Sequence, residues 1–147
     1  MTTGAAAMSW MHLLTSIEGR ISRQPFWITL LCLSVPELAA HFTLGERWSS
    51  IVSLLIAYPN FAVFAKRGHD RNVPTWVAGV FIVGAVVLNL VTLLDLSGPM
   101  TNPTTLFYVV AVPVGIMGLI LLVDFGFRRG TAGPNRYGPD PLATQSQ

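Results

Sequence analysis

The sequence has too little charge for a water-soluble domain. Only 11% of its 147 residues are Asp, Glu, Lys or Arg, whereas a soluble domain carries about 25%, because its surface must be hydrated. Hydrophobic residues make up 52% of the chain. The few charges gather between long apolar runs, as they do in proteins that cross a membrane several times. The composition therefore favours a single membrane-embedded domain over a soluble protein.

Cysteine and the signatures of common enzymes are also scarce. Cys32 is the one cysteine and lies inside an apolar run, so an intrachain disulfide and a cysteine-based zinc cluster are excluded. There is no glycine-rich phosphate loop, no G-x-S-x-G and no H-E-x-x-H. We therefore expect no cofactor, assign no metal site, and favour a non-catalytic protein over an enzyme.

Four apolar runs account for most of the chain: residues 26–44, 48–65, 75–96 and 106–123. The first run, as a helix, reaches about 28 Å and matches the ~30 Å hydrocarbon core of a bilayer. The second follows after a short turn, so the first two helices must be antiparallel. The sequence predicts an all-α membrane protein with four transmembrane helices, arranged as two antiparallel hairpins.

The two ends of the chain are more polar than its middle, the transmembrane domain at residues 25–124. Residues 1–24 form a predicted cytoplasmic arm. Four of its apolar residues share one helical stripe: Trp10, Leu13, Leu14 and Ile17. Such an amphipathic segment either lies on the membrane as an interfacial helix or stays a frayed arm. Residues 125–147 form a tail rich in glycine and proline, where no long helix is expected.

The distribution of Lys and Arg predicts the orientation. Eight of the nine lie in the arm, in residues 66–74 between the second and third runs, or in the tail, whereas Arg47 lies in the first turn on the other side. Positive charge is retained in the cytoplasm, so we expect both termini and residues 66–74 to be cytoplasmic. Because topology explains these basic residues, nucleic acid is not an expected partner.

Three segments of the chain together resemble one family. They are GRISRQPFW at residues 19–27, KRGHDR at 66–71 with Trp76 beyond it, and GTAGPNRYGPDP at 130–141. In this order they are similar to segments of the bacterial inner-membrane family known as domain of unknown function 805. The resemblance implies a small multi-pass protein of the bacterial inner (plasma) membrane, and it implies no reaction.

The middle segment departs from the family pattern R-R-L-H-D. Lys66 stands for the first arginine and Gly68 for the leucine, and Val73-Pro74-Thr75 replaces the usual Ser-Gly before the tryptophan. Lysine is a point charge and lacks the planar fork of arginine. We therefore expect no bidentate contact from position 66.

Charged residues from all three segments are expected at the cytoplasmic face: Arg20, Arg23, Arg67, His69, Asp70, Asp124 and Arg129. One interpretation is a ring of basic residues that sets the topology, with carboxylates neutralising their neighbours. The other is a site for a lipid phosphate or a phosphorylated small molecule, because arginine offers paired donors to phosphate oxygens. In that site Arg20 and Arg67 would contact the anion, and Asp70 would orient His69.

Polar residues inside the apolar runs form a second candidate site. Glu37 and His41 lie four residues apart on one helix face, and Asn89 and Asp95 lie in the outer half of the third run. Ionisable residues at membrane depth often mark proton or ion paths, and two carboxylates with an imidazole are acceptable zinc ligands. Alternatively, Glu37 and His41 bond to each other, and His41 and Asp95 reach the headgroups.

The tail contains a last motif, formed by Asn135, Tyr137, Gly138 and Asp140. The tail either docks on the basic face through these residues or stays solvated. The leading hypothesis is an integral inner-membrane protein of unassigned role that contacts the bilayer and binds an anionic phospholipid or a partner through its basic face. The first alternative is a small transporter or channel subunit that uses Glu37 and His41, as a homo-oligomer because four short helices leave little room for a pore. The second is an enzyme acting on a phosphorylated lipid.

Overall fold

The computed structural model describes residues 10–143, and the regular structure in this range is entirely helical, with no β-strand. The helices are α1 (Trp10–Thr15), α2 (Arg23–Leu44), α3 (Glu46–Leu55), α4 (Ala57–Asp70), α5 (Thr75–Leu93) and α6 (Thr105–Phe127). The first nine residues of the predicted arm and the last four of the predicted tail lie outside the described range.

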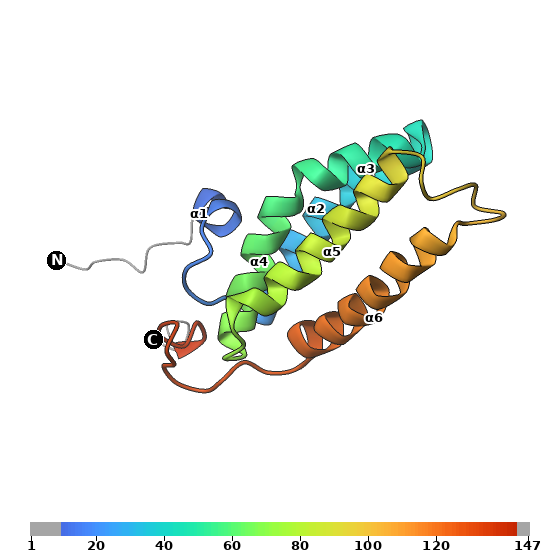
Figure 1. The fold of residues 1–147 in the computed structure, drawn as a ribbon. Coiled ribbons are helices and arrows are strands. Elements are labelled where there is room, and N and C mark those ends of the chain that lie inside the picture. Colours follow the sequence, from blue (N-terminus) through green and yellow to red (C-terminus); the bar gives the residue numbers. More distant parts are fainter. Residues whose placement is uncertain (1–9, 144–147) are drawn as a thin grey trace.

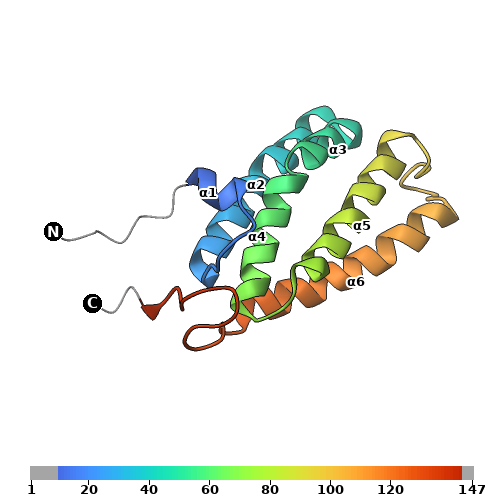
Figure 2. The same cartoon turned by 60° about the vertical axis from the view of Figure 1, so that its left-hand side comes forward.

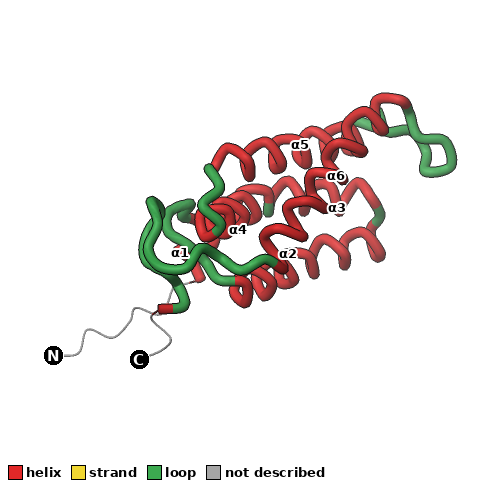
Figure 3. The backbone as a smooth tube through the Cα atoms, turned by 90° about the horizontal axis from the view of Figure 1, so that it is seen from below, coloured by secondary structure: helices red, strands yellow, loops and turns green. Residues whose placement is uncertain are grey.

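Four rods lie alongside one another in the bundle: α2, the pair α3 and α4, α5, and α6 (Figure 1). Successive rods run in opposite directions because their connections are short. Gly45 alone separates α2 from α3, with a φ of +91° that glycine adopts without strain. The loops before α2 and after α6 gather at one end of the bundle, and residues 94–104 lie at the other (Figures 2 and 3). We call the first the arginine end and the second the opposite end.

The long helices expose most of their apolar surface. α2, α5 and α6 are each long and apolar enough to cross a membrane, and α3 with α4 makes a fourth, bent candidate. In the apolar windows of α2, α5 and α6 only 11%, 11% and 6% of the residues are buried. Large exposed apolar surfaces are unfavourable in water and suit lipid. The helices are therefore compatible with the predicted all-α membrane protein.

The second predicted span is not one continuous helix. α3 and α4 meet at Ile56 and are bent by 56° relative to each other. Pro59 explains the break, because it has no amide hydrogen for the carbonyl group of Leu55 and its ring crowds the preceding turn. The sequence predicted a second span at residues 48–65, and the bend within it was not predicted.

α4 also extends through charged residues that were predicted to form a loop. Its last turn comprises Lys66 to Asp70, and all of these residues are buried. The chain then turns at Asn72, which has a φ of +58°, a conformation that asparagine tolerates better than most residues. The helix continues here because other segments of the chain pair its charges, which helical periodicity alone does not reveal.

The best-packed part of the molecule lies near the arginine end. Its buried apolar side chains are Leu13, Ile21, Phe26, Val63, Phe64, Ala65, Ala78, Leu121 and Phe125. The ring of Phe64 lies 5.5 Å from that of Phe26 and 6.2 Å from that of Phe125, between centroids, in the range where aromatic pairs attract. This core fixes α2, α4 and α6 beneath the charged residues of the arginine end.

α1 confirms a short helix in the predicted arm, and it is anchored to α4. Leu13 is buried, and Lys66 donates a hydrogen bond from Nζ to the Leu13 carbonyl oxygen at 3.0 Å. Trp10 and Ile17, from the same predicted stripe, are exposed. A position of α1 on the membrane surface stays a prediction.

Candidate functional site

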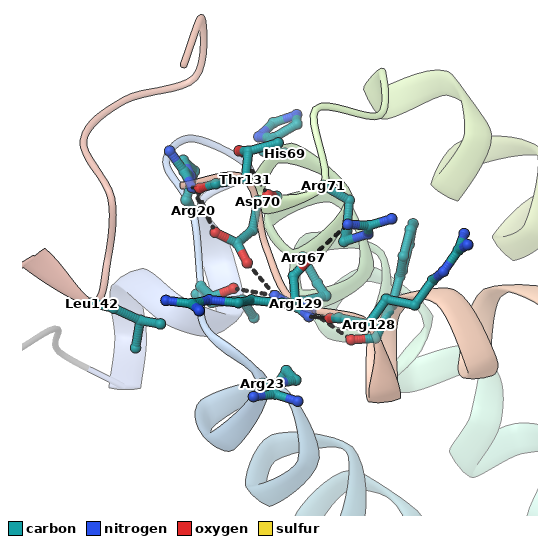
Figure 4. Close-up of polar contacts among 12 residues, drawn as sticks. Arg20, Arg23, Arg67, His69, Asp70, Arg71, Arg128, Arg129, Thr131 and Leu142 are labelled. Atoms are coloured by element: carbon teal, nitrogen blue, oxygen red, sulfur yellow. Dashed lines mark hydrogen bonds and ion pairs between the residues drawn. The ribbon is translucent and has the colours of Figure 1, made fainter. Parts of the chain in front are cut away.

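Asp70 is the centre of a buried charge network at the arginine end (Figure 4). Its Oδ1 accepts hydrogen bonds from Arg20 at 3.1 and 2.9 Å, and its Oδ2 accepts from Arg67. The side chains of Arg20, Arg67 and Asp70 are 1%, 1% and 4% exposed. Buried charges persist only when they are paired and hydrogen-bonded. One carboxylate between two guanidinium groups leaves excess positive charge, which needs further acceptors.

Backbone carbonyl groups supply acceptors for Arg67. Its Nε donates to the Phe125 oxygen at 2.5 Å, its Nη2 to the Arg128 oxygen at 2.6 Å, and its Nη1 to the Ile21 oxygen at 3.3 Å. Phe125 and Arg128 lie at the C-terminal end of α6, where carbonyl groups lack helical partners and carry the negative end of the helix dipole. Arg67 therefore caps α6 and joins it to α4.

Arg20 holds the tail in the same way. It donates to the carbonyl oxygens of Thr131 at 2.6 Å, Gly133 at 2.8 Å and Gly138 at 3.3 Å. Together with its two bonds to Asp70, these use all five of its N–H groups. Thr131 reinforces the junction, because its amide and hydroxyl groups both donate to the Asp70 carbonyl oxygen, at 2.8 and 3.0 Å.

The tail motif packs on the end of α4. Asn135 Nδ2 donates to the His69 carbonyl oxygen at 2.9 Å, and the Tyr137 ring stacks on the His69 ring at 3.8 Å between centroids. The Asp140 carboxylate accepts hydrogen bonds from the amides of Leu142 and Gly133, which hold the pKa of this carboxyl below its usual range. The tail is therefore docked on the arginine end, which was one of the two alternatives predicted from the sequence.

The side chains of His69 and Asp124 form no hydrogen bond with the Asp70 carboxylate. His69 is fixed through Nδ1 by the Gly19 carbonyl oxygen at 3.0 Å and through Nε2 by the Thr75 hydroxyl at 2.7 Å. The prediction that Asp70 orients His69 was wrong, because the Asp70 carboxylate turns toward the arginine side chains.

Asp124 instead forms a second, more exposed ion-pair group. It accepts from Arg71 at 3.3 and 3.2 Å and from Arg128 at 2.9 Å, and its side chain is 22% exposed. Sequence reasoning missed Arg71, although it lies in the charged stretch that was singled out. It also missed Thr131, whose backbone contacts leave no signal in the sequence.

The outer arginine residues have free donors. Arg23, Arg128 and Arg129 are exposed. Arg23 makes one side-chain hydrogen bond, to the Phe127 oxygen at 3.2 Å, and the Arg129 guanidinium makes none within residues 10–143. A cavity of about 170 Å³ lies between them, and it is lined by Ser22, Arg23, Gln24, Arg67, Asp70, Arg129, Gly130 and Leu142. Unlike the Asp70 network, this surface is open to a ligand.

The second candidate site is only partly assembled as predicted. Glu37 accepts a hydrogen bond from Ser53 and shares a cavity of about 210 Å³ with Asn89. His41 makes no hydrogen bond to Glu37 and lines a neighbouring cavity.

Asp95 does not join Glu37, contrary to the prediction. α5 ends at Leu93, and Asp95 lies in the following turn with a φ of +57°. Its side chain is 81% exposed and pairs with Arg47 at 3.6 Å. The described part of the chain contains no group of three His, Cys, Asp or Glu that could hold a metal ion, so the zinc alternative has no ligand set there.

Comparison with known proteins finds similarity over nearly the same part of the chain as the three segments at residues 19–27, 66–71 and 130–141. Residues 14–139 match a family described as "Protein of unknown function (DUF805)". The uncharacterized protein YiiR of Escherichia coli strain K12 and that of strain O157:H7 are each 30% identical over 138 residues, covering 90% of this chain and 90% of the relative. No solved structure matches the chain. The chain therefore belongs to the DUF805 family of proteins of unknown function.

Proposed function

We propose that the protein crosses the bacterial inner membrane four times, with both termini in the cytoplasm, and binds an anionic phospholipid headgroup at its arginine end. The bent pair α3 and α4 would form the second span. The orientation is supported by the positions of Lys and Arg, because eight of the nine lie toward the arginine end and only Arg47 lies toward the opposite end.

The headgroup proposal rests on one observation: some arginine residues are buried and hydrogen-bonded within the protein, whereas others are exposed and have free donors. Arg20 and Arg67 are buried and donate to Asp70 and to backbone carbonyl groups. They cannot bind an anion without releasing the tail or α6. Arg23 and Arg129, in contrast, flank an open cavity and have unused N–H groups. We therefore assign the headgroup contacts to Arg23 and Arg129, and not to Arg20 and Arg67 as predicted from the sequence.

A groove on α6 favours a whole phospholipid over a free phosphorylated molecule. It has a volume of about 420 Å³ and is lined by Leu119, Ile120, Val123, Asp124 and Arg128. Its apolar part suits an acyl chain, and its charged end at Arg128 adjoins Arg129, the next residue in the chain. Basic pockets between helices on the cytoplasmic side are a common form of phospholipid site.

The enzyme alternative gains no support from the geometry. A reaction on a phosphorylated lipid needs a side chain that is free to transfer a proton. Both ring nitrogens of His69 and both carboxylate oxygens of Asp70 already take part in hydrogen bonds. These groups are arranged to hold segments of the chain together.

Native mass spectrometry of the purified protein with phosphatidylglycerol tests the proposal. Each arginine near an anionic surface contributes about 1 kcal/mol, so the double variant Arg23→Gln/Arg129→Gln should bind the lipid roughly thirty times more weakly. Arg47→Gln is the matched control, because it removes an exposed arginine from the opposite end. Equal lipid binding by the double variant and the control would contradict the proposal.

A further inference from the structure

A cavity with several polar residues in its lining lies within the bundle where α3 and α4 bend. It has a volume of about 210 Å³ and is bordered by α2, α3, α4 and α5. Its polar lining residues are Ser34, Glu37, Ser53, Asn60 and Asn89. At 1.5 Å per residue, Glu37 lies about 21 Å along α2 from Arg23 and about 10 Å from Leu44. The carboxylate is therefore well inside the proposed span.

In the described part of the chain, the Glu37 carboxylate has no positively charged partner. Within residues 10–143, the ion pairs of Lys and Arg involve other carboxylates, and the side-chain partner of Glu37 is the Ser53 hydroxyl group. A carboxylate at membrane depth is unfavourable and usually has a partner charge or a functional role. The missing positive charge indicates a cationic ligand.

The other polar lining residues have side-chain oxygen atoms that can still accept or coordinate. Ser34 and Asn89 donate to carbonyl groups of their own helices at 2.8 and 2.9 Å, and Ser53 donates to Glu37. The oxygen atoms of these side chains retain lone pairs, and the amide of Asn60 makes no side-chain hydrogen bond in the described structure. Carboxylate, hydroxyl and amide oxygens around one cavity are typical ligands of hard cations.

We infer that this cavity binds a small monovalent cation, an alkali ion or a protonated amine, with Glu37 as the counter-charge. A single carboxylate balances a single positive charge, whereas divalent ions prefer several carboxylates. The volume corresponds to about seven waters at ~30 Å³ each, so the cation can keep part of its hydration shell. This binding site is independent of the headgroup site at the arginine end.

A second cavity shares Ser34 and Glu37 with the first and extends toward the opposite end, as far as His41 and Ser49. It has a volume of about 280 Å³ and is lined by Ser34, Glu37, Leu38, His41 and Ser49. Toward the arginine end, the first cavity meets the rings of Phe64 and Phe81, whose centroids are 5.2 Å apart. Phe64 belongs to the buried core beneath Asp70. A cation would therefore enter from the opposite end and stop at these rings.

The break at Ile56 places polar residues from both halves of the bent span around Glu37. Ser53 precedes the break and Asn60 follows it, one residue after Pro59. In membrane transporters, interrupted helices commonly hold the coupling ion near the middle of the bilayer. The position of the cavity at such a break agrees with a cation as its ligand.

Isothermal titration calorimetry on the purified full chain tests the inference. Sodium chloride, potassium chloride and methylammonium chloride are titrated separately in a background of bulky N-methylglucamine chloride, and the three arms distinguish an alkali ion from an amine. We expect saturable binding of at least one cation, and an affinity at least tenfold lower in Glu37→Gln. Glu46→Gln, which removes an exposed carboxylate of α3, should leave the affinity unchanged.

Two results would overturn the inference: no saturable binding of any of the three cations to the wild type, or equal affinity in Glu37→Gln. If Glu37→Gln does not fold, Asn89→Leu takes its place, since it removes one oxygen ligand and leaves the carboxylate. Unchanged affinity in folded Asn89→Leu would then count against the site. The Arg23→Gln/Arg129→Gln variant should bind the cation normally, which separates this test from that of the headgroup proposal.

Discussion

Asp70 pairs with two buried guanidinium groups, and its backbone carbonyl oxygen accepts two hydrogen bonds from the tail. Loss of its negative charge would leave two buried positive charges without a carboxylate partner. Without the carboxylate, Arg20 and Arg67 would repel each other in a region from which water is largely excluded. At the scale of single residues, Asp70 is therefore the residue on which the arginine end most depends.

Asp70→Asn should lower the free energy of unfolding by about 3 kcal/mol or more, because breaking a buried ion pair leaves uncompensated charge. Thermal unfolding of the purified protein in detergent measures the effect. Asp95→Asn serves as the control, since its exposed pair with Arg47 contributes at most about 1 kcal/mol. Similar stability losses in the two variants would show that the Asp70 network is not a structural centre.

Asp140 gives the docked tail a pH dependence. Its pKa lies below the ordinary 3.8 in the docked state, because the amides of Leu142 and Gly133 donate to the charged form. The contribution to docking is therefore complete above pH 3.8 and is lost as the pH falls through the lower, docked-state pKa. The protection of these two amides against hydrogen exchange, relative to an unprotected amide at the same pH, should be constant near neutral pH and should fall in acid.

Asp140→Asn provides the check on this assignment. The neutral amide side chain is a weaker acceptor than a carboxylate, so exchange at the Gly133 amide should be faster than in the wild type at neutral pH. The acid-induced step should also disappear. A variant that keeps the full step would place its origin in another carboxyl group.

At the scale of elements, the tail behaves as part of the fold although it forms no helix. Residues 130–140 pass over the end of α4 and are held by backbone contacts to Arg20 and Asp70. Gly130 lies so close to Asp70 that a Cβ atom there would overlap the carboxylate. The glycine content that predicted an irregular tail thus also permits its close approach to α4.

Gly130→Ala should destabilise the docked tail, because the added methyl group must displace the Asp70 carboxylate or the tail itself. Overpacking of this kind costs about 1–3 kcal/mol. Gly115→Ala in α6 is the matched control, since beyond the adjacent backbone of α6 no atom lies within 4 Å of the added Cβ. In addition, alanine favours a helix over glycine by about 1 kcal/mol. Thermal unfolding should therefore shift in opposite directions in the two variants.

At the scale of the whole molecule, charge and apolar surface are separated. The long sides of the bundle expose apolar side chains of α2, α5 and α6, whereas the arginine end carries the paired charges and the docked tail. In a membrane, this distribution would leave the sides in lipid and the arginine end at one surface. The proposed orientation puts that end in the cytoplasm.

Single cysteines introduced at the two ends test the orientation. In a Cys32→Ala background, Met100→Cys in the loop between α5 and α6 should react with a membrane-impermeant maleimide on intact spheroplasts. Leu142→Cys, in the exposed part of the tail, should react only after permeabilisation. Because the charge bias is strong, we expect a clear difference, and the reverse pattern would contradict the proposed topology.

The helical membrane character and the family were predictable from the sequence, because they depend on properties that are local in the chain. Apolar runs of sufficient length predict helices, and α2, α5 and α6 agree with the predicted runs to within a few residues. The three segments around residues 19–27, 66–71 and 130–141 identified the family and, as the structure shows, supply much of the network around Asp70.

Only the tertiary structure decided which charged residues are internal and which are available. From the sequence, Arg20, Arg67 and Arg129 were placed in one cluster, and the anion contacts were assigned to Arg20 and Arg67. These two donate to Asp70 and carbonyl groups, whereas Arg129 has free donors. The reason is that burial and hydrogen bonding depend on segments that are 50 or more residues apart in the sequence. The same long-range packing separated Asp95 from Glu37 and extended α4 through a stretch whose charge had predicted a loop.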